Sequence, residues 1–312
     1  FFCPSKDYAE RELGDKCPSC GRTYGLVLDH PPTKIGNYRI TKHLGRGFYG
    51  AAYVAEAGFV GKKYVIKISP VAFYSFAPFK KTPFLDEVRL HAELAASATH
   101  AVDIIDAIPD ETVVFTDDAA TSIPCHVTVL DYVEGDLLKD FVNSRTPPSA
   151  ASICQVAIDL LQLRAELEAN KLNHNDLHSE NLIVERLRPE SRRPDAIDPM
   201  LQVMAIDLGS VSDESKSTDD RQGDLGFIAE HVNTLLARLL AKPDQMEDRD
   251  FRVALALQGI IGNLRADPQN LRLPNPADMV AQGRESFYRA SHHWRPWMNP
   301  LSLKGFADRY NA

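Results

Sequence analysis

The polar segment at residues 172–184 restricts the fold of this chain more than any other stretch of its sequence. Before it, residues 149–171 carry an amphipathic pattern that predicts a helix, and the segment ends in an apolar run that predicts a short strand. The polar residues between the two elements include His174, Asp176 and Asn181. A carboxylate such as that of Asp176 can orient an acceptor hydroxyl and take its proton, which is one requirement of phosphoryl transfer.

A second apolar run, at residues 203–206, predicts another strand that leads directly into Asp207. Oxygen atoms of asparagine and aspartate are ligands that Mg²⁺ accepts, so Asn181 and Asp207 could hold the ion against a triphosphate. Phosphoryl transfer also uses a lysine–glutamate pair that fixes the α- and β-phosphates.

A glycine-rich turn lies between two strand-like runs near the start of the chain. Residues 37–41 alternate like a strand, Gly45, Gly47 and Gly50 follow, and residues 51–55 form the second run. Glycines at this spacing let a hairpin turn bring its backbone N–H groups close to phosphate oxygens. A dinucleotide-binding loop is followed by a helix, so the strand after this turn argues against a Rossmann fold. An ordinary glycine hairpin remains the alternative for this motif alone.

Lys67 lies inside an apolar, strand-like run, where a buried ammonium group needs an anionic partner. A surface lysine whose charge reaches water is the alternative. A helical pattern at residues 84–94 offers two candidate partners, Glu87 and Glu93. The spacing favours Glu87.

Taken in order, these motifs resemble those of the protein-kinase superfamily over roughly residues 36–260. The matching residues are Gly45, Gly47, Gly50, Lys67, Glu87, His174, Asp176, Asn181 and Asp207. The resemblance implies an α+β, bilobal protein-kinase-like fold, with a small β-rich N-lobe that contains one helix and a larger helical C-lobe. The N-lobe and hinge would occupy residues 36–135. The C-lobe and a C-terminal extension would occupy residues 136–312.

The resemblance also implies roles for the matching residues, with ATP and Mg²⁺ as cofactors. The three glycines would cover the phosphates. Lys67 and Glu87 would form an ion pair, and Lys67 would also contact ATP. Asp176 would be the catalytic base, while Asn181 and Asp207 would bind Mg²⁺.

Three further residues, together with His174, match supporting positions of the same family. Asp131 and Val133 resemble the hinge that binds adenine through its backbone. Asp224 resembles the aspartate that braces the catalytic loop, and His174 resembles a scaffold residue of that loop.

The sequence departs from the usual protein-kinase pattern around the acceptor site. Asn175 stands where many protein kinases have arginine, and His178 stands where serine/threonine kinases usually have lysine. A histidine there resembles the aminoglycoside and choline phosphotransferases, and we take His178 as a further catalytic candidate. Asp224 follows Asp207 by only 17 positions, so the segment that docks peptides in protein kinases is short.

Three functions remain open on these observations. The first is an ATP-dependent kinase that phosphorylates serine or threonine in proteins. The second is a kinase for a small-molecule hydroxyl, and the third is a pseudokinase or binding module. The third must explain why every catalytic carboxylate is retained.

Cysteines crowd the first part of the chain, residues 1–34. The Cys17-Pro18-Ser19-Cys20 turn is shaped like a zinc knuckle, which points two thiolates at one ion. Cys3 could supply a third ligand of a structural Zn²⁺, and His30 or a residue upstream of Phe1 a fourth. Free thiols are the alternative. A zinc-ribbon-like appendage of this kind would suit protein docking.

Composition limits the remaining possibilities. The net charge of −8 argues against nucleic acid or an anionic membrane as a partner. No apolar run reaches the roughly 18 residues of a transmembrane helix, and the cysteine pattern suits the cytoplasm. Cys125 and Cys154 lie in apolar surroundings and are predicted to be core residues. Residues 187–200, rich in proline and arginine, predict an exposed loop.

Overall fold

The computed structural model describes residues 31–46, 50–58, 61–71, 83–115, 122–208, 211–213, 218–241 and 246–265. The chain divides into two compact units. The first comprises Phe1–Glu93 and Val102–Tyr132, and the second comprises Leu94–Ala101 and Val133–Ala312. Helix α3, Phe84–Ser97, therefore begins in the first unit and ends in the second.

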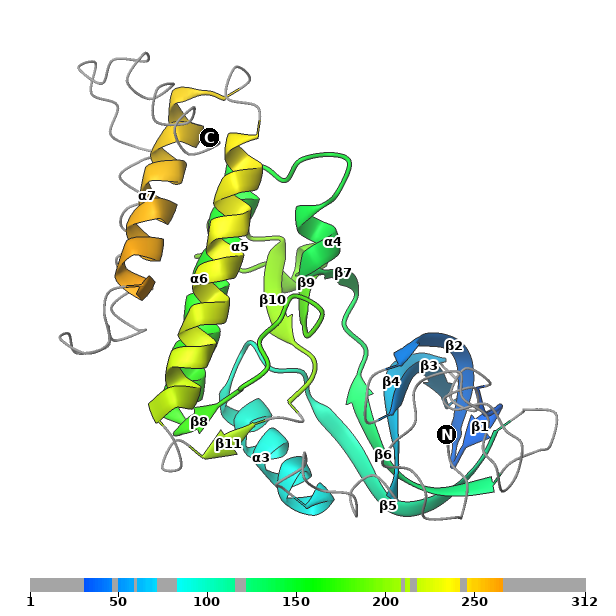
Figure 1. Ribbon diagram of the computed structural model, residues 1–312. Coiled ribbons are helices and arrows are strands. Elements are labelled where there is room, and N and C mark those ends of the chain that lie inside the picture. The colour runs from blue at the N-terminus through cyan, green and yellow to red at the C-terminus, as the bar shows by residue number, and fades with distance from the viewer. Residues whose placement is uncertain are drawn as a thin grey trace, which may run out of the picture. The chain divides into compact units, whose positions relative to one another are not determined.

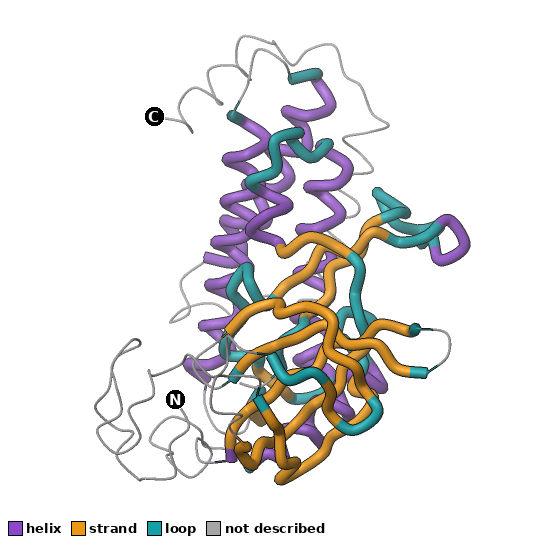
Figure 2. The backbone as a smooth tube through the Cα atoms, turned by 90° about the vertical axis from the view of Figure 1, so that its right-hand side faces the viewer, coloured by secondary structure: helices purple, strands orange, loops and turns teal. Residues whose placement is uncertain are grey.

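A six-stranded antiparallel sheet, with strand order β1-β2-β3-β4-β6-β5, makes up most of the described part of the first unit (Figure 2). Its strands are β1 (Lys34–Ile35), β2 (Tyr38–Arg46), β3 (Ala51–Ala57), β4 (Lys62–Pro70), β5 (Ile104–Val114) and β6 (Ser122–Asp131). The two strands predicted around the glycine turn correspond to β2 and β3. Both end later than predicted. Strand β2 continues through Gly45 to Arg46, and β3 continues to Ala57.

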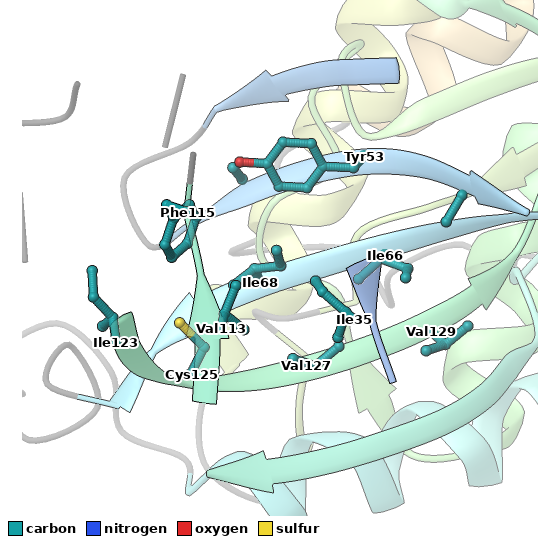
Figure 3. Close-up of a cluster of buried hydrophobic side chains, with 12 residues drawn as sticks. Ile35, Tyr53, Ile66, Ile68, Val113, Phe115, Ile123, Cys125, Val127 and Val129 are labelled. Atoms are coloured by element: carbon teal, nitrogen blue, oxygen red, sulfur yellow. The ribbon is translucent and has the colours of Figure 1, made fainter. Parts of the chain in front are cut away.

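One face of this sheet carries a hydrophobic core. Side chains of a strand alternate between the two faces, and in β4 the core side is taken by Ile66 and Ile68. Figure 3 shows these residues close to Tyr53 of β3 and Val127 of β6. Because Lys67 lies between Ile66 and Ile68, its side chain points to the opposite face.

Helix α3 packs on the face of the sheet that Lys67 occupies. The ring of Phe84, the first residue of α3, stacks on the ring of His126 in β6 with centroids 4.4 Å apart. His126 pairs with Ser69, two residues after Lys67, and directly paired residues share a face. The helix therefore begins on the side of the sheet opposite the hydrophobic core.

The second unit is mainly helical in its described part. Its helices are α4 (Leu138–Val142), α5 (Ala150–Ala169), the 3₁₀ turn η1 (Pro189–Ser191), α6 (Thr218–Leu240) and α7 (Asp248–Arg265). Its short strands are β7 (Gly135–Leu137), β8 (Leu172–Asn173), β9 (Leu182–Arg186), β10 (Leu201–Ala205) and β11 (Ser212–Asp213). Figure 1 shows α5, α6 and α7 running side by side.

Helix α5 is the central element of this unit. Ser149 caps its N-terminus, since the hydroxyl of Ser149 accepts a hydrogen bond from the backbone N–H of Ser152. Apolar side chains around the whole circumference are buried, including Leu160, Leu161 and Leu163. The helix expected at residues 149–171 is present as Ala150–Ala169, but its polar side chains Asp159, Arg164 and Glu166 are buried as well, where an amphipathic helix would expose them.

Three expectations about burial can be compared with the structure. Cys125 and Cys154 are buried, and burial raises the pKa of each thiol to about 12. The loop predicted at 187–200 to be exposed is exposed at residues 188–192, 194 and 195, and the side chain of Arg193 is 23% exposed. None of the helices in the described ranges is long and apolar enough to cross a membrane.

Candidate active site

Asp176, His178 and Asn181 come together in the turn between β8 and β9. The Nδ2–H₂ group of Asn181 donates hydrogen bonds to the backbone oxygen and to Oδ2 of Asp176, at 2.9 and 3.0 Å. Nε2 of His178 lies 3.5 Å from the other carboxylate oxygen, Oδ1. The side chain of Asp176 is 40% exposed and that of His178 43% exposed, so a substrate in solution can reach both.

The carboxylate of Asp224 in α6 binds the backbone of this turn. The backbone N–H groups of His174 and Asn175 donate to its two carboxylate oxygens at 2.7 and 2.9 Å. Arg164 of α5 lies 3.6 Å from the same carboxylate and is fully buried with it. The bracing position expected of Asp224 is thus seen directly in these contacts.

The hairpin of β9 and β10 brings Asp207 next to Asn181. Leu182 pairs with Ala205, and the backbone N–H of Ile206 donates to the carbonyl oxygen of Asn181 at 3.0 Å. Asp207 follows Ile206, so two residues with oxygen ligands stand at adjacent strand ends. Such a pair fits Mg²⁺, which usually takes one or two protein carboxylates and completes its shell with phosphate oxygens and water.

No cluster of three or more histidine, cysteine, aspartate or glutamate side chains suited to a metal ion occurs within the described ranges. The predicted zinc ligands Cys3, Cys17, Cys20 and His30 all lie outside the residues that the structure describes.

In the first unit, Gly45 and Lys67 belong to one row of paired residues across three strands. Gly45 of β2 pairs with Ala52 of β3, and Ala52 pairs with Lys67 of β4. Gly50 approaches the carbonyl oxygen of Ile68 so closely that a Cβ atom there would lie 2.0 Å from it. Glycine is therefore required at position 50 by the backbone itself. Gly47 lies outside the described residues.

Of the two candidate partners for Lys67, Glu87 has the more suitable place. Phe84, His91 and Leu94 form the buried face of α3, and Glu87 lies on that face at helical spacing. Glu93 is exposed and forms an ion pair with Arg89 one turn earlier, at 2.9 Å. Lys67 and Glu87 are thus on the same side of the sheet, and both are partly buried.

The predicted hinge residues follow strand β6. The side chain of Asp131 accepts from Nζ of Lys62 at 3.0 Å and from the backbone N–H of Tyr132 at 3.1 Å. Its carboxylate is therefore occupied by neighbours, which fits a role for Asp131 through its backbone. Val133 is partly exposed.

Sequence reasoning missed a buried charge network beside α5. His100 contacts Glu166 through Nδ1 at 3.0 Å and Asp159 through Nε2 at 3.3 Å, and Arg193 also binds Asp159, at 2.8 Å. Burial by itself would lower the pKa of His100, but hydrogen bonds with the two carboxylates outweigh it and raise the pKa. Burial opposes ionisation of Asp159 and Glu166, yet the contacts with His100 lower both of their pKa values.

A second missed residue is His231 of α6. Its Nε2–H donates to the backbone oxygen of Leu177 at 2.6 Å, next to Asp176. The signal that could have found His231 is its spacing of seven positions from Asp224, about two helical turns, which puts both residues on one face of α6.

Comparison with known proteins gives a curated relative and a structural likeness. No family model matches the chain. Serine/threonine-protein kinase Pkn1 of Myxococcus xanthus is 24% identical over 212 residues, which are 68% of this chain. The match spans only 27% of the length of that relative. Among solved structures, the BubR1 kinase domain matches with a TM-score of 0.60 and 13% identity, over 91% of this chain and 89% of that chain. The structural likeness shows that the α+β fold of this chain is that of a protein kinase domain.

Proposed function

We propose that this chain is an ATP-dependent phosphotransferase whose acceptor is a serine or threonine hydroxyl of a protein. The observation that carries the proposal is the cluster of Asp176, Asn181 and Asp207 on one turn and one hairpin. The kinase fold and the kinase relative support a phosphotransferase in general. The name of that relative favours serine and threonine as acceptors.

Asp176 would act as the base through the carboxylate oxygen that faces His178. Asn181 binds Oδ2 and the backbone of Asp176, which fixes the direction of the carboxylate. Oδ1 then remains on the partly exposed side, where an acceptor hydroxyl could donate its proton. A positioned base of this kind contributes about 10²–10⁴-fold to the rate.

The residues present fit Mg²⁺ and ATP. Because Asn181 uses Nδ2 for Asp176, its Oδ1 is the atom suited to a metal ion, together with the carboxylate of Asp207. Lys67 would bind phosphate oxygens, and Glu87 would hold its ammonium group in place. Bound Mg²⁺ would neutralise charge that develops on the transferred phosphoryl group.

A small-molecule acceptor is the second candidate, and His178 is the observation that favours it. Its ring lies 3.5 Å from Asp176, at a position where protein kinases of the serine/threonine type usually carry lysine. The acceptor would then be a metabolite hydroxyl that the ring of His178 contacts.

The proposal is tested with purified protein and radiolabelled Mg-ATP. The protein is incubated alone, with a mixed protein pool and with a metabolite pool, and the label is followed into each. We expect label in protein serine or threonine, and a rate at least about 100-fold lower for Asp176→Asn. Thr234→Ala, an exposed change on α6, is the matched control and should keep the wild-type rate.

Label in the metabolite pool alone would favour the small-molecule candidate. Wild-type protein that transfers no phosphate to either pool, or Asp176→Asn protein with the full rate, would contradict the proposed function.

A further inference from the structure

Helix α6 contacts the turn around Asp176 at two places, and only the first of them was expected. Asp224 accepts hydrogen bonds from the N–H groups of His174 and Asn175. His231 donates to the carbonyl oxygen of Leu177 with an N···O distance of 2.6 Å, and only 8% of His231 is exposed. A polar group buried to this extent is normally retained in its hydrogen bond, because leaving either partner unpaired costs about 1–3 kcal/mol.

The two contacts lie on either side of Asp176. Asp224 binds the two residues that precede Asp176, and His231 binds the residue that follows it. The seven positions between Asp224 and His231 correspond to about 10 Å along one face of the helix. One face of the helix therefore holds the backbone on both sides of Asp176.

The turn needs such support because its backbone is strained. Asn175 has a φ of 67°, a left-handed conformation that side-chain-bearing residues adopt at an energetic cost. Asparagine adopts this conformation more readily than most residues, so the cost lies at the low end of the about 1–3 kcal/mol typical of such strain. Asn181 binds the backbone oxygen and Oδ2 of Asp176 directly, and His231 binds the next carbonyl, that of the peptide between Leu177 and His178. Without His231 the segment from Leu177 to Asn181 could shift, and the Asp176 carboxylate that Asn181 binds would shift with it.

We propose that His231 is a positioning residue for phosphoryl transfer, which acts by holding the Leu177 carbonyl and thereby the direction of the Asp176 carboxylate. The inference rests on the proposed function, because it takes Asp176 as the base. His231 is buried and its assigned partner is the Leu177 carbonyl, so its effect is expected in the chemical step and not in nucleotide binding.

The ionisation of His231 agrees with this role. Burial lowers the pKa of His231, and this effect outweighs the opposite influence of the Leu177 hydrogen bond and of Glu230, while His178 lowers the pKa further. The ring is therefore neutral at pH 7 and carries its proton on Nε2, the atom that donates to Leu177. A neutral donor orients the peptide without placing a charge beside the base.

Two substitutions separate hydrogen bonding from packing. His231→Gln keeps an N–H donor at about the position of Nε2, whereas His231→Leu keeps apolar volume and removes the donor. We expect His231→Leu to lower kcat about 10–100-fold with the KM for ATP unchanged within twofold, since small misplacements of a catalytic group have effects of this size. His231→Gln should stay within about threefold of the wild-type kcat.

Hydrogen exchange reports the contact without any assay of activity. The amides of residues 174–177 should exchange faster in His231→Leu than in the wild-type protein, and His231→Gln should restore the slow exchange. Thr234→Ala, on the same helix, should match the wild type in both measurements. If His231→Leu does not fold, His231→Met provides a second variant without a donor.

Equal kcat values for His231→Leu and the wild type would overturn the inference. So would an equal loss in His231→Leu and His231→Gln, which would mean that the ring acts by packing. If the wild-type protein transfers no phosphate, the proposed function fails. In that case unchanged exchange at residues 174–177 in His231→Leu would also overturn the anchoring role.

Discussion

Arg164 is the largest side chain without any exposed surface in the described ranges, and it lies beneath the turn that carries Asp176. One guanidinium nitrogen, Nη1, donates to the backbone oxygen of Leu172 at 3.0 Å and lies 3.6 Å from Asp224. Asp224 in turn accepts the two N–H groups before Asp176. The buried guanidinium group of Arg164 therefore neutralises the buried carboxylate of Asp224, which binds the backbone of the turn.

Arg164→Met should destabilise the protein by about 3–5 kcal/mol, because it leaves the charge of Asp224 buried without its cation. The loss is measured as the free energy of unfolding in urea, followed by circular dichroism. Arg39→Ala is the control, since Arg39 forms an exposed ion pair with Glu56, and pairs of that kind contribute about 0–1 kcal/mol. A similar small change for both variants would show that Arg164 does not stabilise the turn.

At the scale of elements, strand β7 depends on one glycine. A Cβ atom on Gly135 would lie 2.3 Å from the carbonyl oxygen of Val184 in β9, the strand that pairs with β7. No side chain fits there without moving one strand from the other.

We expect Gly135→Ala to destabilise the protein by about 1–3 kcal/mol, as overpacking generally does. Gly226→Ala is the matched control, because Gly226 lies within α6 with no atom within 4 Å of an added Cβ. An exposed helical glycine replaced by alanine should stabilise the protein by about 0.5–1 kcal/mol. Thermal unfolding of the two variants should therefore shift in opposite directions, and shifts in the same direction would contradict the geometry of β7.

The segment Leu94–Ala101 is attached to α5 by the network around His100. Thr99 and the backbone of His100 also bind the carboxylate of Glu166. Because the folded state raises the pKa of His100, its stabilising effect is complete below the unfolded value of about 6.5 and is lost as the pH rises through the folded value. Asp159 and Glu166 have lowered pKa values and stay charged over that range.

The pH dependence can be measured by comparing wild-type protein with His100→Gln. We expect the difference in free energy of unfolding to be largest near pH 6 and to shrink toward pH 9, by at most about 1.4 kcal/mol per pH unit. Other titrating groups are common to both proteins and cancel in the difference. A difference that grows toward pH 9 would show that His100 is neutral in the folded protein.

Elements that are local in sequence could be predicted, and contacts between distant polar residues could not. Asn181 reaches Asp176 across five positions, and the strands around Asp207 follow from apolar runs, so this part of the site was readable. His231 and Leu177 are 54 positions apart, and His100 and Glu166 are 66 apart. A histidine in a helical pattern looks the same whether it faces water or a buried carbonyl, so only tertiary packing reveals its partner.

The loop at 187–200 also makes polar contacts that could not be predicted from the sequence. Its proline and arginine content predicted exposure, yet Arg193 and Gln155 satisfy buried groups there. Arg193 binds Asp159, and Oε1 of Gln155 accepts the backbone N–H of Ile197 at 2.7 Å. Polar groups that are buried are nearly always hydrogen-bonded, and composition alone does not reveal which residues of a loop find such partners.

At the scale of the whole molecule, the proposed roles include residues of both units. Lys67 and Glu87 belong to the first unit, and Asp176, Asn181 and Asp207 belong to the second. A ligand that binds only the folded protein raises its stability by about 2.7 kcal/mol at 100 times its dissociation constant. Thermal unfolding with Mg-ATP therefore tests the nucleotide role of both sets of residues without an acceptor.

We expect saturating Mg-ATP to raise the midpoint of thermal unfolding of the wild-type protein by several degrees. Lys67→Ala and Asp207→Asn should each lose most of this shift, because their side chains are assigned to phosphate and to Mg²⁺. Asp176→Asn should keep the shift, since its carboxylate is assigned to the acceptor hydroxyl. ATP with excess chelator is the control for the metal.

An unchanged midpoint in the wild-type protein would favour a protein that binds no nucleotide. A shift lost in Asp176→Asn but kept in Asp207→Asn would reverse the roles assigned to these two carboxylates.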